Sequence, residues 1–322
     1  MEVHDGAELC FPQLLNTSCR KPLTSWTDAV FLCFLLSTIS VLTVALNLLV
    51  IVSISHFRQT PQTHQPPPLS LSVSDSIIGL VFMPGEILRK TSCWYLGNFM
   101  CSLYMYFTIL TISASVGNTV LISIDRHVAI CDPLHYPTRV TVRRARVCIL
   151  LCWLCSIFYS SLFVKDDPDK GTYCFGKCIF QTDYILGTID VFVTFIIPVT
   201  VIIILYLRVF VVALSQARAI TAVTLQHSVT VTSRKSELKA ARTLGILIAV
   251  FLMCFCPFYC LSIAGQKILR TSYGILVLCL ICFNSCLNPL IYALFYPWFR
   301  RAVKIIVTLQ ILQPGSRETN IL

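Results

Sequence analysis

The sequence predicts an all-α membrane protein, a bundle of seven transmembrane helices followed by a short amphipathic helix on the membrane surface. Hydrophobic residues make up 56% of the 322 residues, charged residues only 12%, and the mean hydropathy is +0.77. Soluble domains are not composed this way. Seven apolar segments are each long enough to cross a bilayer, and they cover residues 26–54, 69–88, 98–130, 147–164, 184–212, 244–264 and 273–296.

The basic residues predict the orientation of this bundle. If the amino terminus lies outside, most of the 25 lysines and arginines fall in cytoplasmic segments, as the positive-inside rule requires. We therefore expect an extracellular segment 1–25, without the apolar core of a cleaved signal peptide, a bundle 26–297, and a cytoplasmic surface helix and tail 298–322, in the plasma membrane. The net charge of +10 is explained by a cytoplasmic rim against anionic lipid, so no nucleic-acid partner is expected.

The expected extracellular segments carry sites for covalent modification. Asn16 begins an Asn-Thr-Ser acceptor for N-glycosylation. The cysteines expected on this side are Cys10, Cys19, Cys101, Cys174 and Cys178. Because the compartment is oxidising, we expect disulfides among these five, but the residues alone leave the pairing open. Most of the other cysteines lie within spans, where they are expected to be small apolar packing residues.

The second and seventh spans carry polar groups at membrane depth. Asn284 and Asn288 lie four residues apart, so they share one helical face, and this face must meet a protein interior because lipid offers amides no partner. Asp75 is the only charge in the middle of the second span. Neighbouring hydroxyls could satisfy it. The alternative that we favour is a small hydrated cation, such as sodium, held by Asp75, Ser115, Asn284 and Asn288, and no other cofactor is expected.

Prolines predict irregular points in two spans. Residues 66–68 are three consecutive prolines without backbone donors, so we expect the second span to be regular only from about Leu69. Pro257 stands in the middle of the sixth span, where it frees a carbonyl and predicts a hinge. Cys254 and Cys256 precede it, but their spacing and the lack of further ligands exclude a metal or redox site.

The third span ends in Asp125-Arg126 at the expected cytoplasmic interface. This pair could be a simple interfacial ion pair. It could also be a latch in which Asp125 holds Arg126 until the helices part. Basic clusters at 139–146 and 218–242 lie on the same side, where they would either hold the membrane surface or form a docking face for an acidic or amphipathic partner helix.

Together these residues resemble the rhodopsin-like G-protein-coupled receptors over the whole chain. The matching residues occur one set per segment, in the family's order: Asn47, Asp75, Trp94, Cys101, Asp125-Arg126, Trp153, Pro198, Pro257 and Asn288-Pro289-Leu290-Ile291-Tyr292. More narrowly, residues 284–299, NSCLNPLIYALFYPWF, resemble the seventh-helix signature of trace amine-associated receptors. The stretches VSISHFRQ, AICDPLHY and KAARTLGI are similar to that family as well.

The resemblance implies an amine-sensing, olfactory receptor that acts through a stimulatory G protein on cAMP. It assigns the activation switch and G-protein coupling to Asp125, Arg126, Phe255, Pro257, Asn288, Pro289 and Tyr292. It also implies two disulfides, Cys101 with Cys178 and Cys19 with Cys174, which would leave Cys10 unpaired.

The sequence departs from the amine-receptor pattern at three positions. The third-helix position where such receptors normally carry an Asp is Thr108. The tyrosine that usually supports this Asp is replaced by Cys282, and the aromatic toggle before the sixth-helix proline is Phe255 in place of Trp. A standard aminergic pocket is therefore not expected.

Asp190 offers a replacement for the missing carboxylate. It lies in the apolar run ILGTIDVFVTFIIP, where a charge at membrane depth costs about 2.5–3.5 kcal/mol unless it is paired. It could lie near the outer interface and bond a neighbouring hydroxyl. The functional interpretation moves the cation site to the fifth helix, which is similar to fish members of the family that lack the third-helix Asp and carry one on the fifth.

The leading hypothesis is therefore a receptor whose ligand ammonium pairs with Asp190. The other expected ligand-binding residues are Thr108, Thr194, Phe195, Phe258, Tyr259 and, as an alternative carboxylate, Glu86. The competing hypothesis is a transporter or channel for small cations, but internal repeats and paired broken helices are missing from the sequence. An enzyme is not expected, because no span places a Ser, a His and an Asp together in a usable catalytic constellation.

Overall fold

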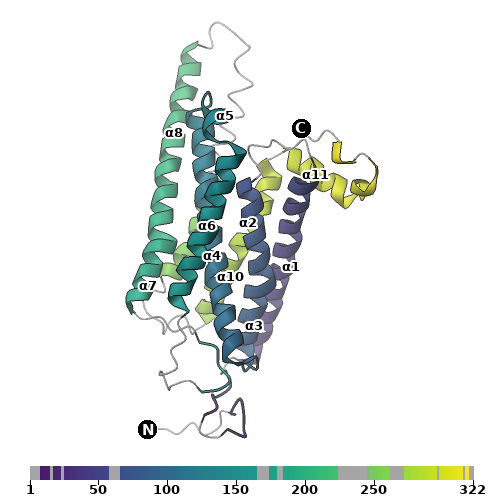
Figure 1. Ribbon diagram of the computed structural model, residues 1–322, viewed down its shortest axis with the longest axis vertical. Helices are drawn as coiled ribbons and strands as arrows, with labels where there is room; N and C mark the ends of the chain where they lie inside the picture. Colours follow the sequence, from purple (N-terminus) through teal and green to yellow (C-terminus); the bar gives the residue numbers. More distant parts are fainter. Residues whose placement is uncertain are drawn as a thin grey trace.

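The structure is a computed structural model that describes residues 8–14, 17–22, 25–57, 66–164, 174–179, 184–223, 245–246, 248–260, 272–295, 297–314 and 316–318. These residues form an elongated bundle of helices, and no β-strand occurs among them (Figure 1). Segment 8–22 lies beyond one end of the bundle, which we call the disulfide end, and helix α11 lies at the opposite end, which we call the α11 end. Asn16 lies outside the described residues.

The spans follow one another in the predicted order. Among the described residues, six segments are long and apolar enough to cross a membrane, and the sixth predicted span contains the shorter apolar helix Ile248–Cys260. The predicted all-α transmembrane bundle is therefore confirmed. The labelled elements of the bundle are α1 (Trp26–His56), α2 (Pro66–Ile77), η2 (Ile78–Phe82), α3 (Met83–Thr91), α4 (Gly97–Cys131), α5 (Tyr136–Arg139), α6 (Val142–Phe163), α7 (Tyr184–Asp190), η3 (Val191–Ile196), α8 (Ile197–Val223) and α10 (Ser272–Phe295).

Side-chain caps set where two of these helices begin. The Ser25 hydroxyl accepts a hydrogen bond from the Asp28 amide at 3.1 Å, and Thr141 accepts one from the Arg144 amide at 3.3 Å. Each bond satisfies one of the free amides of a first helical turn. The cap at Thr141 starts α6 five residues before the predicted apolar span, because apolar composition marks the hydrocarbon core and not the end of the helix.

The expectation that the second span is regular only from about Leu69 is wrong. Helix α2 begins at Pro66 and includes all three prolines. The first turn of a helix has no intrahelical acceptor for its amides, so a proline there loses no hydrogen bond, and its fixed φ angle already suits the helix.

Two π-helical turns interrupt the second and fifth spans. The turn η2 precedes Pro84 and the turn η3 precedes Pro198. A proline ring clashes with the carbonyl four residues before it, and these carbonyls belong to Leu80 and Thr194, inside the two π turns. The wider π turn relieves the clash, and it also redirects the side chains on either side of it.

Polarity in the bundle is arranged for a lipid environment. Polar side chains such as Asn47, Asp75 and Asn118 are fully buried, whereas large apolar side chains such as Phe34 and Phe158 face outward. Asn47 donates to the Ser285 carbonyl at 3.0 Å and so joins α1 to α10. Helices in lipid associate through such polar contacts and close packing, because the surrounding lipid is as apolar as the outer side chains.

Two disulfides at the disulfide end pair the cysteines that the resemblance implied. Cys101 at the start of α4 is bonded to Cys178, and Cys19 is bonded to Cys174. The described part of the loop after α6, residues 174–179, is therefore attached both to the bundle and to segment 8–22.

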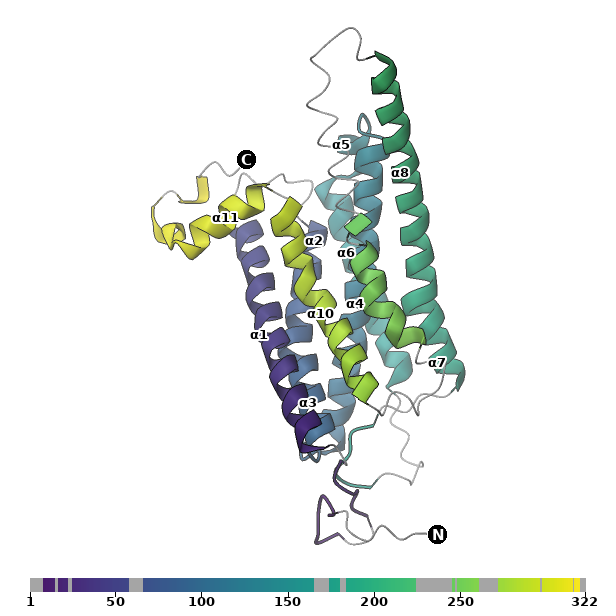
Figure 2. The same ribbon diagram turned by 180° about the vertical axis from the view of Figure 1, so that it is seen from behind.

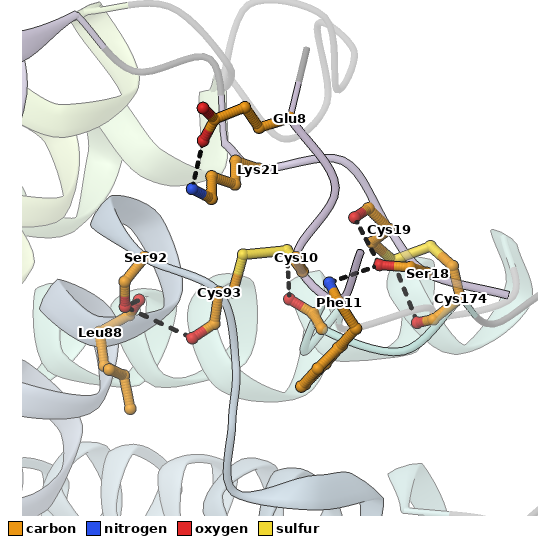
Figure 3. The surroundings of a disulfide bond; sticks show 11 residues. Glu8, Cys10, Phe11, Ser18, Cys19, Lys21, Leu88, Ser92, Cys93 and Cys174 are labelled. Atoms are coloured by element: carbon orange, nitrogen blue, oxygen red, sulfur yellow. Dashed lines mark hydrogen bonds and ion pairs between the residues drawn. A yellow bond between two sulfur atoms is a disulfide. The ribbon is translucent and has the colours of Figure 1, made fainter. Parts of the chain in front are cut away.

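The expectation that Cys10 stays unpaired is wrong, because it forms a third disulfide with Cys93 (Figure 3). Cys93 lies two residues beyond the end of α3, in the short turn before α4, and was not among the five cysteines expected on the extracellular side. Gly176 lies against this bond with φ +106°, and a Cβ atom there would come within 2.5 Å of the Cβ of Cys10. A glycine is thus required where the loop passes the disulfide.

Segment 8–22 is further ordered by backbone hydrogen bonds. Leu9 and Arg20 form an antiparallel bridge, and the Cys10 amide donates to the Cys19 carbonyl at 2.8 Å. Glu8 and Lys21 form an ion pair next to this bridge, which lowers the pKa of Glu8 (Figure 3).

Helix α11 (Pro297–Val307) lies across the α11 end of the bundle at a steep angle to α1 and α10 (Figure 2). Phe299 and Ala302 are buried against the bundle, whereas Arg300, Arg301 and Lys304 are exposed. This confirms the predicted short amphipathic helix, whose basic face suits a membrane surface.

Candidate functional site

A cavity of about 230 Å³ lies inside the bundle and is lined by six of the seven predicted spans, α1 being the exception. The first group of lining residues is aromatic or aliphatic: Phe82, Met105, Ile109, Ile112, Phe163, Phe255, Phe258, Tyr259, Leu278 and Ile281. The second group is polar or charged: Glu86, Arg89, Thr108, Ser113, Asp190 and Thr194. A largely apolar cavity with a few charged groups is the usual form of a small-molecule site.

Asp190 ends α7 and reaches the cavity wall just before the π turn η3. Its Oδ1 accepts a hydrogen bond from the Tyr159 hydroxyl at 2.7 Å. Thr194 donates to the Asp190 carbonyl at 2.6 Å, and its hydroxyl lies 2.7 Å from that of Tyr259. Among the residues that the structure describes, no cation pairs with Asp190. The carboxylate is therefore held in place by neutral groups and keeps its negative charge available to the cavity.

Sequence reasoning missed Tyr159. It lies on α6 and does not line the cavity, yet it positions the Asp190 carboxylate from behind. An apolar span of this kind has no periodic polar face from which the orientation of a single tyrosine can be read. A hydroxyl group at membrane depth was the only available signal, because such a group needs a partner.

The remaining aromatic residues divide into lining and supporting groups. Phe258 and Tyr259 line the cavity. Phe195 does not line it but stacks on Tyr259, with ring centroids 4.4 Å apart. Phe255, which lies two residues before Pro257, also lines the cavity. Its ring packs on that of Phe251, with ring centroids 4.6 Å apart.

Thr108 lines the cavity from α4, at the position where the resemblance leads one to expect an Asp. Its hydroxyl oxygen is buried and has no hydrogen-bond partner among the described residues. It therefore offers a bound molecule a neutral hydrogen-bonding group.

Glu86 is the second carboxylate of the cavity, and it is already paired. Arg89 donates to both of its oxygens, from Nε to Oε1 at 2.8 Å and from Nη2 to Oε2 at 2.7 Å. The Tyr104 hydroxyl donates to Oε1 at 2.9 Å. The spacing of three residues between Glu86 and Arg89 on one helix was a signal for this pair in the sequence.

A second polar cluster surrounds Asp75, in the interior of the bundle. Ser115 donates to Oδ1 at 3.1 Å and Asn288 donates to Oδ2 at 2.8 Å. The carboxylate is fully buried, and the described residues include no cation that pairs with it. Asn284 is buried on the same helix as Asn288, but within the described part of the chain it makes no hydrogen bond to Asp75.

The Asp125-Arg126 pair lies near the α11 end of α4. Arg126 donates from Nε to Oδ2 of Asp125 at 2.9 Å and makes a second contact through Nη2. Tyr136 on α5 donates to the other oxygen, Oδ1, at 2.8 Å. Both residues of the pair border a small cavity of about 30 Å³ that also contacts Tyr292. The contacts that a latch requires are therefore present.

Comparison with known proteins gives a consistent result. The model of the family described as 7 transmembrane receptor (rhodopsin family) matches residues 46–292. The chain is 35% identical to trace amine-associated receptor 13c of Danio rerio over 336 residues, which cover 99% of this chain and 97% of the relative. It is 34% identical to trace amine-associated receptor 4 of Mus musculus, with 98% and 95% covered, and 36% identical to receptor 7e of that species, with 98% and 92% covered.

Proposed function

The chain belongs to the trace amine-associated receptors of the rhodopsin family, and from this premise we propose that it detects small amines whose ammonium group pairs with Asp190. Membership makes it a multi-pass membrane receptor and not an enzyme, with a small-molecule ligand and a heterotrimeric G protein as partners. It also favours the receptor hypothesis over the transporter or channel.

The observation that carries the proposal is the unpaired carboxylate in an apolar cavity. An ammonium that leaves water for this cavity loses its favourable hydration free energy. A carboxylate that has no cation of its own can offset this loss by forming an ion pair with the ammonium. Asp190 is held by Tyr159 and Thr194, which are neutral, so its charge is not cancelled among the described residues. The rings of Phe258 and Tyr259 on the cavity wall favour a cation further by cation–π attraction.

The test is a screen of small amines on the expressed receptor with cAMP as the readout. We expect at least one amine to raise cAMP in wild-type cells and to lose this effect in Asp190→Asn at equal surface expression. If every active amine kept its potency in Asp190→Asn, the fifth-span site would be refuted.

Orientation and coupling are parts of the same proposal. The excess of basic residues in the segments that the sequence predicts to be cytoplasmic supports an extracellular amino terminus, which would place Asn16 where glycosylation occurs. We assign coupling to a stimulatory G protein, and a role in olfaction, from the family resemblance. A cAMP rise on agonist addition, absent in cells that lack the stimulatory α subunits, would test the coupling.

The cluster at Asp75 is proposed as the site of an allosteric sodium ion. The fit is supported by a fully buried carboxylate whose hydrogen-bond donors, among them Ser115 and Asn288, are neutral. A buried negative charge of this kind is stabilised by a small cation. The ion would be held by Asp75, with Ser115 and Asn288 as neighbours and Asn284 further along α10.

A further inference from the structure

The two carboxylates of the main cavity are in different electrostatic states. Asp190 has only neutral partners among the described residues, whereas Glu86 is bound by a guanidinium. Both line the same cavity, and so does Arg89. The cavity therefore holds two negative charges and one built-in positive charge, and the formal charge left for a ligand to balance is a single negative one.

The pairing of Arg89 with Glu86 is strongly determined. Both residues lie on α3 with a spacing of three, so the pair forms within one helix and needs no movement of another span. The guanidinium binds both carboxylate oxygens, which is the strongest geometry available to this pair. Glu86 is only 4% exposed, and Tyr104 on α4 binds it from the other side.

Arg89 also keeps one donor group for the cavity. Its Nε and Nη2 are used by Glu86, and Nη1 has no hydrogen-bond partner among the described residues. Arg89 lines the cavity, so with Glu86 in place a ligand would meet its guanidinium as part of a neutral pair. Without Glu86 it would become an unpaired cation on the cavity wall.

We propose that Arg89 is a built-in cation that occupies the second carboxylate of the cavity and so makes the receptor selective for amines with a single positive charge. This inference rests on the proposed function of Asp190 as the ammonium partner. The ligand class is a monoamine with an apolar body, because the remaining walls are mostly aromatic and aliphatic. A diamine is rejected because its second ammonium meets a carboxylate that is already neutralised.

The proposal predicts a change of ligand class in two opposite directions. Removing the charge of Arg89 leaves Glu86 without its guanidinium partner, as a second carboxylate in the cavity that suits a diamine. Removing the charge of Glu86 leaves Arg89 as a free cation, which suits an ammonium ligand that ends in a carboxylate. A pair that only stabilises the fold would change neither preference.

The experiment compares three ligand series of matched chain length on cells that express the receptor, with cAMP as the readout. The series are n-alkylamines, α,ω-diamines and ω-amino carboxylates. Wild-type receptor should respond to the monoamine at a concentration at least tenfold lower than to the diamine. Arg89→Gln should shift the diamine-to-monoamine potency ratio by at least tenfold toward the diamine, and Glu86→Gln should shift potency toward the amino carboxylate.

Two controls separate the ligand effect from general damage. Arg20→Gln removes a positive charge from an exposed residue of segment 8–22, which does not line the cavity, and should leave the potency ratio unchanged. Combining Arg89→Gln with Glu86→Gln removes the freed carboxylate and should abolish the gain for diamines. Surface labelling of each variant corrects for changes in expression.

The outcomes distinguish this inference from the proposed function. If Asp190→Asn abolishes the monoamine response while Arg89→Gln and Glu86→Gln leave all potency ratios unchanged, the inference is overturned and the Asp190 site stands. If Asp190→Asn has no effect, the proposed function itself fails. If neither variant reaches the surface, the test is the relative potency of matched monoamines and diamines on wild-type receptor. Equal potency would contradict selectivity for a single charge.

Discussion

Tyr159 on α6 donates its hydroxyl to Oδ1 of Asp190 at 2.7 Å and so fixes a fifth-span carboxylate from a neighbouring helix. The bond determines which way the carboxylate faces. Because Tyr159 remains outside the cavity, it positions Asp190 without competing with a ligand for space.

Substitution of Asp190 should therefore have the largest effect on amine potency. Losing one member of a buried charge pair costs about 2–5 kcal/mol, and about 1.4 kcal/mol corresponds to tenfold in affinity. We expect Asp190→Ala to weaken amine potency by about 30-fold or more in a cAMP assay, and Asp190→Glu to be milder. Thr108→Ala should change potency much less, because Thr108 contributes only a hydroxyl. Equal losses for Thr108→Ala and Asp190→Ala would contradict this assignment.

Tyr159→Phe should reduce amine potency without abolishing the response. A hydrogen bond to a charged group contributes about 1.5–3 kcal/mol, so a loss of about tenfold to about a hundredfold is expected. The matched control is Tyr106→Phe, because the Tyr106 hydroxyl makes a long bond of 3.5 Å to a backbone carbonyl and does not touch Asp190. If both tyrosines gave the same small change, the positioning role of Tyr159 would be wrong.

Sodium should favour the resting receptor through Asp75. A cation that binds one conformation better than the other shifts the equilibrium by the difference in its two affinities. We expect replacement of sodium by potassium in membrane preparations to raise basal nucleotide exchange or agonist potency, and Asp75→Asn to remove this dependence. Indifference of the wild-type receptor to sodium would leave the cluster with a purely structural role.

Loss of the Cys10–Cys93 disulfide should lower the stability of the receptor. Because the other two disulfides already connect segment 8–22 to the bundle, this bond closes a loop of only about 20 residues, for which the chain-entropy model gives about 3 kcal/mol. Cys10→Ser, Cys93→Ser and the double variant should lower the thermal midpoint in detergent by the same amount. Cys33→Ser, at a free cysteine of α1, is the control. Additive losses in the double variant, or peptide mapping that joined Cys10 to another cysteine, would contradict the pairing.

Weakening the hold on Asp125 should raise basal signalling. Tyr136→Phe removes one hydrogen bond to a charged carboxylate, of about 1.5–3 kcal/mol, which corresponds to a shift of about tenfold or more toward the active state. Asp125→Asn should have a larger effect, because it also removes the charge that holds Arg126. Thr138→Ala, on the same short helix α5, should have no effect. Unchanged basal cAMP in both Asp125→Asn and Tyr136→Phe would exclude the latch.

Several features could be read from the sequence because they depend on composition and local chemistry. Seven apolar runs determine how often the chain crosses a bilayer, since lipid accepts only segments whose backbone groups are satisfied internally. Helix α11 was predictable because the chain changes from apolar to amphipathic beyond Tyr296, with Arg300, Arg301 and Lys304 among apolar residues. Asp75 and Asp190 could be identified as candidate site residues because a carboxylate at membrane depth is costly unless it is paired or binds a ligand.

Other features were decided only by the tertiary structure, because they depend on which residues of different spans meet. Nothing in the apolar run around Tyr159 indicates that its hydroxyl faces Asp190, and nothing near Cys10 indicates Cys93 as its partner. Glu86 could be named from the sequence as a carboxylate near the cavity. Its spacing of three residues from Arg89 indicated that the two could pair. Only the tertiary structure shows that Arg89 binds both carboxylate oxygens and that Tyr104, on another helix, donates to the same group, since the charge at a site depends on distances between side chains.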